Sequence, residues 1–224
     1  MTAIALHYDE AAHLAGYTAR LVAWDERAAV RVQVRGRVIG VYGAPPLDCL
    51  TLLVLPLAEP AGEGTDGVDT VVSAGRLRDI IGDVTTAWGP AARVLPLPDP
   101  IGPRAELAVL PPRDGWLPGE QGLAGDVAPL VAGAAAQARA ALEAAPHASD
   151  AERQRIVDDV WTQPGWGGLP LPALHAARGL GFLAHDGMRV ASATAPGWKR
   201  FTAPGGQVFV RTTGLPALSL AVLR

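Results

Sequence analysis

Eight of the chain's 20 prolines fall between Pro90 and Pro118, and this cluster limits where regular structure can form. Proline fixes φ and has no backbone N–H, so a segment this rich in proline favours extended chain and cannot supply all the donors that a strand needs. We therefore predict a boundary within the chain. The three predicted parts are an α+β sheet domain (1–89), a Pro-rich connector (90–118) and a helical domain with a terminal hairpin (119–224).

The first half alternates apolar and polar residues in short runs, which is typical of strands with one buried face. After an initial strand, Asp9 and Glu10 open a run with helical spacing through Ala11, Leu14 and Leu21. The predicted strands are 2–8, 30–34, 37–42, 50–57 and 68–73, and the predicted helices begin at 9 and 76. Residues 107–110 offer a further edge strand, which would make part of the proline-rich segment belong to the first sheet. We expect a mixed or antiparallel sheet in this half.

The second half has the signals of three helices and a β-hairpin. Residues 126–145 are rich in alanine with apolar residues on one face, and Pro146 ends that run. Ser149 and Glu152 form a capping box for a second helix, because each side chain can reach the other residue's backbone N–H. The remaining predictions are a third helix (171–178), strands (188–193 and 207–212) around a loop at Trp198, and a terminal strand (215–223). The predicted class is α+β.

Composition is that of an ordinary globular chain, with 49% apolar residues among 224. The longest apolar stretch, Cys49 to Leu57, is far shorter than the ~20 residues that a membrane helix needs. The first residues lack the basic and apolar regions of a secretory signal. Cys49 is the only cysteine, so an intrachain disulfide and a thiolate metal cage are excluded. We expect a soluble, cytoplasmic protein without cofactor or membrane partner.

Three motifs suggest chemistry, but ordinary structure explains each of them better. Residues 62–67 match the letters of a dinucleotide-binding loop, yet a strand follows where that loop needs a helix. Glu10 and His13 have the spacing of metal ligands on a helix, with His7 nearby, but no second pair exists. Cys49 lacks an adjacent cation that would activate its thiol. We predict no metal site; a competing hypothesis is an enzyme using His7, His13 and Cys49 between the two halves.

Charge reverses along the chain. Residues 1–150 hold 11 Arg and 18 Asp or Glu, a formal −7, whereas residues 151–224 hold 8 Lys or Arg and 4 acids, a formal +4. The only lysine lies in Trp198-Lys199-Arg200-Phe201, at the predicted tip of the hairpin. An aromatic and basic patch could meet a phosphate or an acidic partner. The candidate ligand or nucleic-acid contacts are Trp198, Lys199, Arg200, Arg189 and Arg211.

A second cationic group belongs to the first half. Arg31, Arg35 and Arg37 are predicted to project from one face of adjoining strands. They could bind an anion or a nucleic-acid backbone, but a solvated face with acids on the neighbouring strand gives the same pattern.

Two resemblances concern DNA. The strand, helix and strands of residues 1–84, with the run Val71-Val72-Ser73-Ala74-Gly75-Arg76-Leu77-Arg78-Asp79-Ile80-Ile81, resemble the first domain of bacterial DNA sliding clamps. This resemblance implies a module that encircles or accompanies DNA. The chain is too short for the three domains of a bacterial clamp subunit, and the three-helix run after Asp126 does not repeat the first pattern. No functional residue is carried over.

The order helix, helix, helix, hairpin over residues 122–213 is similar to winged-helix DNA-binding domains, in which the third helix enters the major groove. In residues 171–184 only His175 and Arg178 have polar side chains that could reach a base edge, whereas base recognition needs several Arg, Asn or Gln side chains. Any DNA contact implied by this resemblance would therefore involve phosphates, through the basic residues of the hairpin.

Taken together, these patterns predict a non-catalytic binding or scaffolding protein that uses the basic hairpin. An acidic or other protein partner and a homo-oligomer are compatible with this hypothesis. The alternatives are a nucleic-acid-associated protein, clamp-like or winged-helix-like, and the enzyme with a site between the halves.

Overall fold

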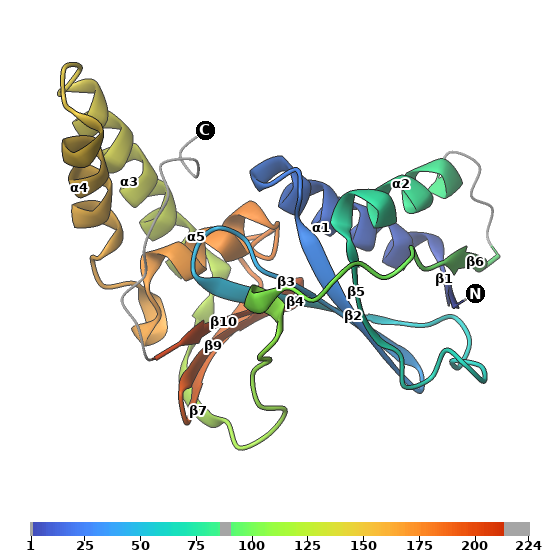
Figure 1. The fold of residues 1–224 in the computed structure, drawn as a ribbon. Helices are drawn as coiled ribbons and strands as arrows, with labels where there is room; N and C mark the ends of the chain where they lie inside the picture. The colour runs from blue at the N-terminus through green and yellow to red at the C-terminus, as the bar shows by residue number, and fades with distance from the viewer. Residues whose placement is uncertain (1, 86–90, 213–224) are drawn as a thin grey trace. The chain divides into compact units, whose positions relative to one another are not determined.

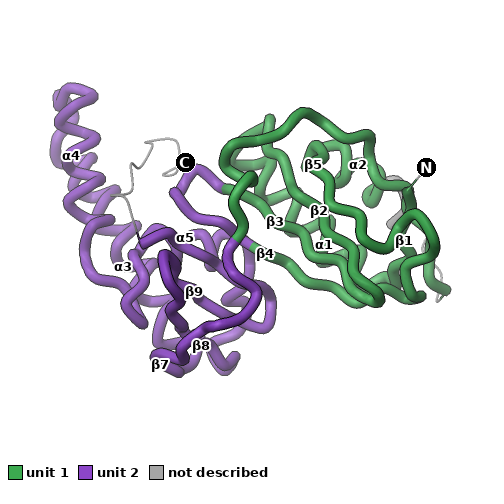
Figure 2. Tube along the Cα trace, turned by 60° about the horizontal axis from the view of Figure 1, so that its bottom comes forward, with its two compact units in different colours: residues 1–44, 52–110 green, residues 45–51, 111–224 purple. Residues whose placement is uncertain are grey.

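The computed structural model describes residues 2–85 and 91–212, and the chain divides into two compact units (Figures 1 and 2). The units comprise residues 1–44 with 52–110 (unit 1) and residues 45–51 with 111–224 (unit 2). Each unit combines helices with antiparallel strands, so the predicted α+β class is confirmed. Whether the chain divides into folding domains at 90–118 stays a prediction.

Unit 1 begins with a strand, a helix and three further strands. Its elements are β1 (Ala3–Leu6), α1 (Tyr8–Trp24), β2 (Ala29–Arg35), β3 (Val38–Gly43), β4 (Cys49–Pro56, of which the first three residues fall in unit 2), β5 (Asp69–Ser73), α2 (Ala74–Thr85), β6 (Arg93–Pro96) and the 3-10 turn η1 (Ala105–Leu107). Strands β5, β2, β3 and β4 are neighbours in that order, and β1 pairs with β6. The alternating valines of β2 are fully buried, as period-2 side-chain alternation requires.

Helix α1 covers this sheet with the apolar face that its sequence spacing predicts. Ala11, Leu14 and Leu21 are buried, and α2 packs beside α1. The helix lies so close to β3 that a Cβ atom on Gly43 would stand 2.6 Å from Cδ1 of Leu21. A side chain at this position would have to displace the ends of the Leu21 and Tyr17 side chains, so glycine permits the close approach.

Unit 2 also combines antiparallel strands with helices. Its elements are β7 (Leu117–Leu123), α3 (Ala124–Glu143), α4 (Asp150–Trp161), the 3-10 turn η2 (Trp166–Gly168), α5 (Leu171–Gly179), β8 (Arg189–Ala195), β9 (Trp198–Ala203) and β10 (Gly206–Arg211). The strand order is β10, β9, β8, β7. Helix α5 packs on β10 and on α3, while α3 and α4 run side by side as a hairpin (Figure 1). The predicted capping box is confirmed, because Ser149 N donates to Glu152 Oε2 at 2.8 Å and Glu152 N donates to Ser149 Oγ.

The two units share one feature of their element order, which is that helices stand between a first strand and the strands that follow. In unit 1, α1 stands between β1 and the strands β2, β3 and β4; in unit 2, α3, α4 and α5 stand between β7 and the strands β8, β9 and β10. Unit 2 has three helices where unit 1 has one, and β7 pairs with β8 whereas β1 pairs with β6. The expectation that the three-helix run does not repeat the first pattern is therefore not contradicted.

Three predictions need correction. Residues 107–110 are no edge strand, because the chain forms the 3-10 turn η1 there. The proline-rich segment contains strand β6 and the start of β7, in which Pro118 is tolerated at an outer strand. Trp198 to Phe201 lie within strand β9 instead of a loop.

The predicted strand 215–223 lies outside the described residues. Among the residues that the structure describes, no helix has the length and apolar character of a membrane span.

Candidate functional site

The strand register of unit 2 separates the candidate residues onto two faces of its sheet. Arg200 is paired with Phe209 on β10, and Trp198 is paired with Arg211. Because paired residues share a face and neighbours along a strand alternate, these four side chains lie on one face. Arg189 shares it, since β8 pairs Ala191 with Thr202 and Ala193 with Arg200. We call this the arginine–tryptophan face, defined by Trp116, Arg189, Trp198, Arg200, Phe209 and Arg211.

Arginines stack on tryptophans across this face. The Arg200 guanidinium carbon lies 4.5 Å from the centre of the Trp116 ring, and that of Arg211 lies 5.2 Å from the Trp198 ring. The Trp116 ring also meets Phe209, with centroids 5.8 Å apart. Both arrangements are within the range of attractive cation–π contacts.

The loop before β7 fixes Trp116 in this position. Its indole Nε1 donates a hydrogen bond of 3.0 Å to the carbonyl oxygen of Pro112. Gly115 has φ +74°, a left-handed conformation that a side chain would disfavour, and it turns the chain so that Trp116 faces the sheet. Trp116 and Phe209 were not predicted as members of this face, because Trp116 is 84 positions from Arg200 and Phe209 is recognisable only from the register.

The charge of Arg200 has no acidic partner among the described residues. Its Nε atom is buried without a hydrogen-bond acceptor, and burial lowers the pKa of the guanidinium, which still stays charged at neutral pH. Neither ion pair recorded among residues 2–85 and 91–212 involves Arg200. From Arg189 to Arg211 the sequence contains four cationic residues and no acid. Arg200 therefore presents a positive charge that the described residues do not neutralise.

Lys199 belongs to the opposite face, so it cannot act together with Arg200 as the predicted tip. Its Nζ donates a hydrogen bond of 2.6 Å to the carbonyl oxygen of Gly168 in η2. The next residue on that face, Phe201, is fully buried and meets Trp166 edge to face, with centroids 5.9 Å apart. The side chain of Lys199 thus holds η2 against the sheet.

In unit 1, Arg31 is engaged by acceptors of the same unit. Its Nε and Nη2 donate to the two carboxylate oxygens of Asp69 at 2.6 and 2.8 Å, and its Nη1 donates to the carbonyl oxygens of Leu107 and Ala108. The hydrogen bond with Asp69 raises the pKa of Arg31 and lowers that of Asp69. Of the two explanations offered for the arginines of β2, cross-strand pairing with an acid therefore holds for Arg31.

The residues of the competing enzyme hypothesis have different environments. His7 and His13 are exposed at α1, whereas Cys49 is buried, and its burial raises the pKa of the thiol. Within residues 2–85 and 91–212, no three His, Cys, Asp or Glu residues gather closely enough to hold a metal ion. The loop 62–67 leads through turns into strand β5, so it is no dinucleotide-binding loop.

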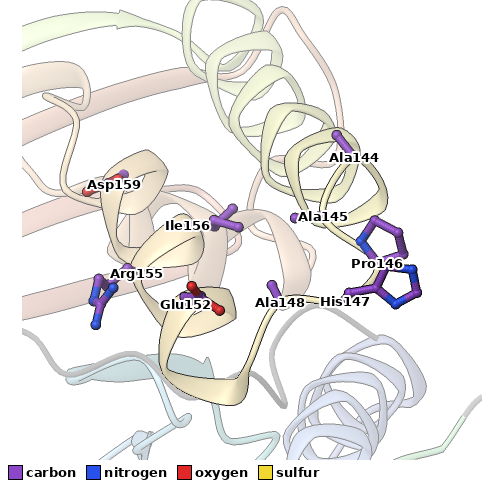
Figure 3. A pocket seen from close by; sticks show the side chains of 9 residues that line it. All are labelled: Ala144, Ala145, Pro146, His147, Ala148, Glu152, Arg155, Ile156 and Asp159. Atoms are coloured by element: carbon purple, nitrogen blue, oxygen red, sulfur yellow. The ribbon is translucent and has the colours of Figure 1, made fainter.

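A hollow of about 630 Å³ lies where α3 turns into α4 (Figure 3). Ala145, Ala148 and Ile156 contribute apolar surface, while Glu152 and Asp159 come from α4. All of its lining residues lie between 144 and 159, and most of them are exposed. The hollow is therefore a local feature of the helical hairpin.

Two family models match the chain, each over less than half of its length. Residues 1–97 match a domain of unknown function (DUF8010), and residues 111–215 match another domain of unknown function (DUF8185). No curated protein is similar in sequence to the chain.

Similar solved structures include DNA polymerase sliding clamps. The clamp from Pseudomonas aeruginosa matches at TM-score 0.55 and 10% identity, over 96% of this chain and 65% of that chain. The DNA polymerase III beta subunit from Thermotoga maritima gives 0.56 and 8%, over 96% and 66%. The DnaN sliding clamp from Bartonella birtlesii, bound to griselimycin, gives 0.56 and 13%, over 96% and 66%. This chain spans slightly less than two thirds of each of these proteins. It shares the fold of bacterial sliding clamps, as the resemblance of residues 1–84 predicted.

Proposed function

We propose that this protein is a clamp-like binding protein that accompanies nucleic acid as part of an assembly. The observation that carries the proposal is the fold shared with DNA polymerase sliding clamps over 96% of the chain. The arginine–tryptophan face supplies a surface for a partner. This proposal favours the nucleic-acid-associated alternative and keeps the binding role of the main hypothesis.

The charges of the helices favour an association with DNA through a partner protein over direct binding of DNA by this chain. Helices α1 to α5 contain seven arginines, no lysine and ten Asp or Glu residues. Tight binding to the phosphate backbone needs an excess of Lys and Arg, whose contacts release counterions. We therefore expect the purified protein alone to bind duplex DNA with a Kd weaker than ~10 µM at physiological salt.

Self-association is part of the proposal. Strand β7 is an outer strand of its sheet, with Leu117 69% exposed and Leu123 45% exposed. An outer strand with unpaired backbone groups can pair with another chain. Light scattering should therefore give a mass of at least two chains of 23.2 kDa each. A monomer at micromolar concentrations would contradict this part.

The central test is whether the full-length protein travels with DNA in the cells that make it. A tagged copy should be enriched several-fold in the DNA-bound fraction and released by nuclease treatment. A tagged cytosolic enzyme without DNA affinity serves as the control. If the protein stays in the unbound fraction with or without nuclease, the proposed function is wrong.

A further inference from the structure

We propose that the arginine–tryptophan face binds an acidic segment of a partner protein, with a carboxylate of that segment paired to Arg200. The inference names the chemistry of the partner and rests on the binding role proposed above.

Arg200 differs from Arg31 in having no acidic partner among the described residues. A guanidinium carries five N–H donors, and those of Arg31 meet a carboxylate and two carbonyl groups, whereas the buried Nε of Arg200 has no acceptor among the described residues. A buried donor without an acceptor is unfavourable. The side chain as a whole is half-buried, so a carboxylate that arrives with a partner can take two parallel hydrogen bonds from the exposed part of the guanidinium.

The guanidinium of Arg200 is held in place before any ligand binds. The Trp116 ring lies over the guanidinium of Arg200, and Trp116 is itself held by Phe209 and by the carbonyl group of Pro112. The charged group therefore loses little conformational freedom when a ligand arrives. Trp116 is only half-buried, so its ring also leaves apolar surface for a side chain next to the carboxylate.

The aromatic rings of this face favour a protein segment over nucleic acid as the ligand. Stacking of bases needs open aromatic rings along a positively charged groove. Here Arg200 covers Trp116, Arg211 covers Trp198, and Trp198 is only 8% exposed. One desolvated guanidinium beside aromatic side chains suits a single carboxylate with an apolar neighbour. It suits a chain of repeated phosphates less well.

Charge complementarity also makes the interaction specific to this face. The whole protein carries a formal charge of −3, so it repels an acidic peptide at long range. Attraction must therefore come from the charge of Arg200, in a strand that contains no acid.

The experiment uses the full chain and a labelled peptide, Gly-Ser-Glu-Asp-Val-Glu-Asp-Gly-Ser, followed by fluorescence polarisation. The control peptide has Gln and Asn in place of Glu and Asp, and a 12-mer oligothymidine represents phosphate. The acidic peptide should bind at least tenfold more tightly than either control. Arg200→Gln should weaken binding of the acidic peptide about tenfold. Arg200→Lys should weaken it less, because the positive charge stays, but binding should still be weaker than in the unmodified protein, because the two parallel N–H donors of the guanidinium are lost. Arg139→Gln, a matched exposed arginine on α3, should leave binding unchanged.

Three outcomes would overturn the inference: equal binding of the neutral peptide, full affinity in a folded Arg200→Gln variant, or an Arg200-dependent preference for oligothymidine. Circular dichroism confirms that each variant is folded, and Arg200→Lys gives a second reading if Arg200→Gln is not. Failure of peptide binding with the protein still in the DNA-bound fraction would reject only this inference. Loss from that fraction with peptide binding intact would reject only the proposed function.

Discussion

Arg31 in unit 1 and Arg200 in unit 2 are the same residue type in similar settings, each on a strand that is paired on both sides, and they have opposite environments. Arg31 donates to Asp69 on the neighbouring strand and to two backbone carbonyl groups. Arg200 stacks on Trp116, and its Nε has no acceptor among the described residues. The difference teaches that an arginine on a sheet serves stability where the fold supplies acceptors and is available to a ligand where the fold supplies only aromatic rings.

The largest loss of stability is expected when Phe201, the residue after Arg200 on β9, is shortened. Phe201→Ala should lower the free energy of unfolding by ~3–5 kcal/mol, because a fully buried ring in contact with Trp166 is replaced by a cavity. Urea denaturation followed by tryptophan emission measures the change. Phe201→Leu, which keeps most of the volume, should cost much less. Equal tolerance of Phe201→Ala and Arg200→Gln would contradict the assignment of two different faces.

The second prediction concerns the pH dependence of the unfolding free energy, which is expected to differ between the two units. His175 packs against Trp161, with ring centroids 4.9 Å apart, and burial together with the charge of Arg178 lowers its pKa to about 4. The unfolded chain, with a His pKa of ~6.5, binds more protons than the folded chain between these values. The unfolding free energy should therefore be constant above pH 6.5 and fall by at most ~3 kcal/mol as the pH drops toward 4.

Urea denaturation at pH 7.5, 5.5 and 4.5 tests this dependence. His175→Leu should remove most of it, whereas His147→Gln, at an exposed site after α3, should retain it. In unit 1, the hydrogen bond from Arg31 lowers the pKa of Asp69. The stabilisation from this ion pair is therefore fully present above the ordinary pKa of an Asp side chain, and it is lost only as the pH falls through the lowered pKa of Asp69. Retention of the full pH dependence in His175→Leu would show that another group causes it.

A smaller loss is expected when the acceptor of Arg31 is removed. Asp69→Asn should lower stability by ~1–2 kcal/mol, because the ion pair is partly exposed but holds two hydrogen bonds to one guanidinium. Thermal denaturation gives the difference from Glu59→Gln, an exposed acid in the same unit that should be nearly neutral. An unchanged melting temperature for Asp69→Asn would contradict a structural role for Arg31.

The smallest effect on stability is expected at Arg200. Arg200→Gln should change the free energy of unfolding by less than ~0.5 kcal/mol, in either direction, because it removes an unpaired charge together with a stacking contact. Denaturation of the ligand-free protein measures it. A loss above ~2 kcal/mol would show that Arg200 is a structural residue like Arg31.

Local spacing predicted much of the fold. The buried stripe of α1 and the cap formed by Ser149 and Glu152 depend on residues three or four positions apart, so the sequence shows them directly. Strand β9 was missed although Pro-Gly pairs stand before and after it, at 196–197 and 204–205, where the chain turns. Those two turn signals could have placed Trp198 within a strand. Strands β6 and β7 were missed because proline argues against a strand, yet outer strands tolerate it.

The candidate face was predicted only in part. Arg189, Trp198, Arg200 and Arg211 were named from charge and composition, and the register places them on one face. Lys199 was grouped with them because it is adjacent in sequence, but adjacent residues on a strand point to opposite faces. Trp116 and Phe209 carry no signal that links them to Arg200 before the strands are paired.

The sequence by itself determined the α+β class, the helices with their caps and the excess of positive charge near the C-terminus, because these depend on composition and on neighbouring residues. The tertiary structure alone decided which arginines are neutralised. Asp69 lies 38 residues from Arg31, and Trp116 is farther still from Arg200, so neither pairing follows from local spacing. Strand register and chain reversal bring such groups together, and they depend on packing across the whole unit.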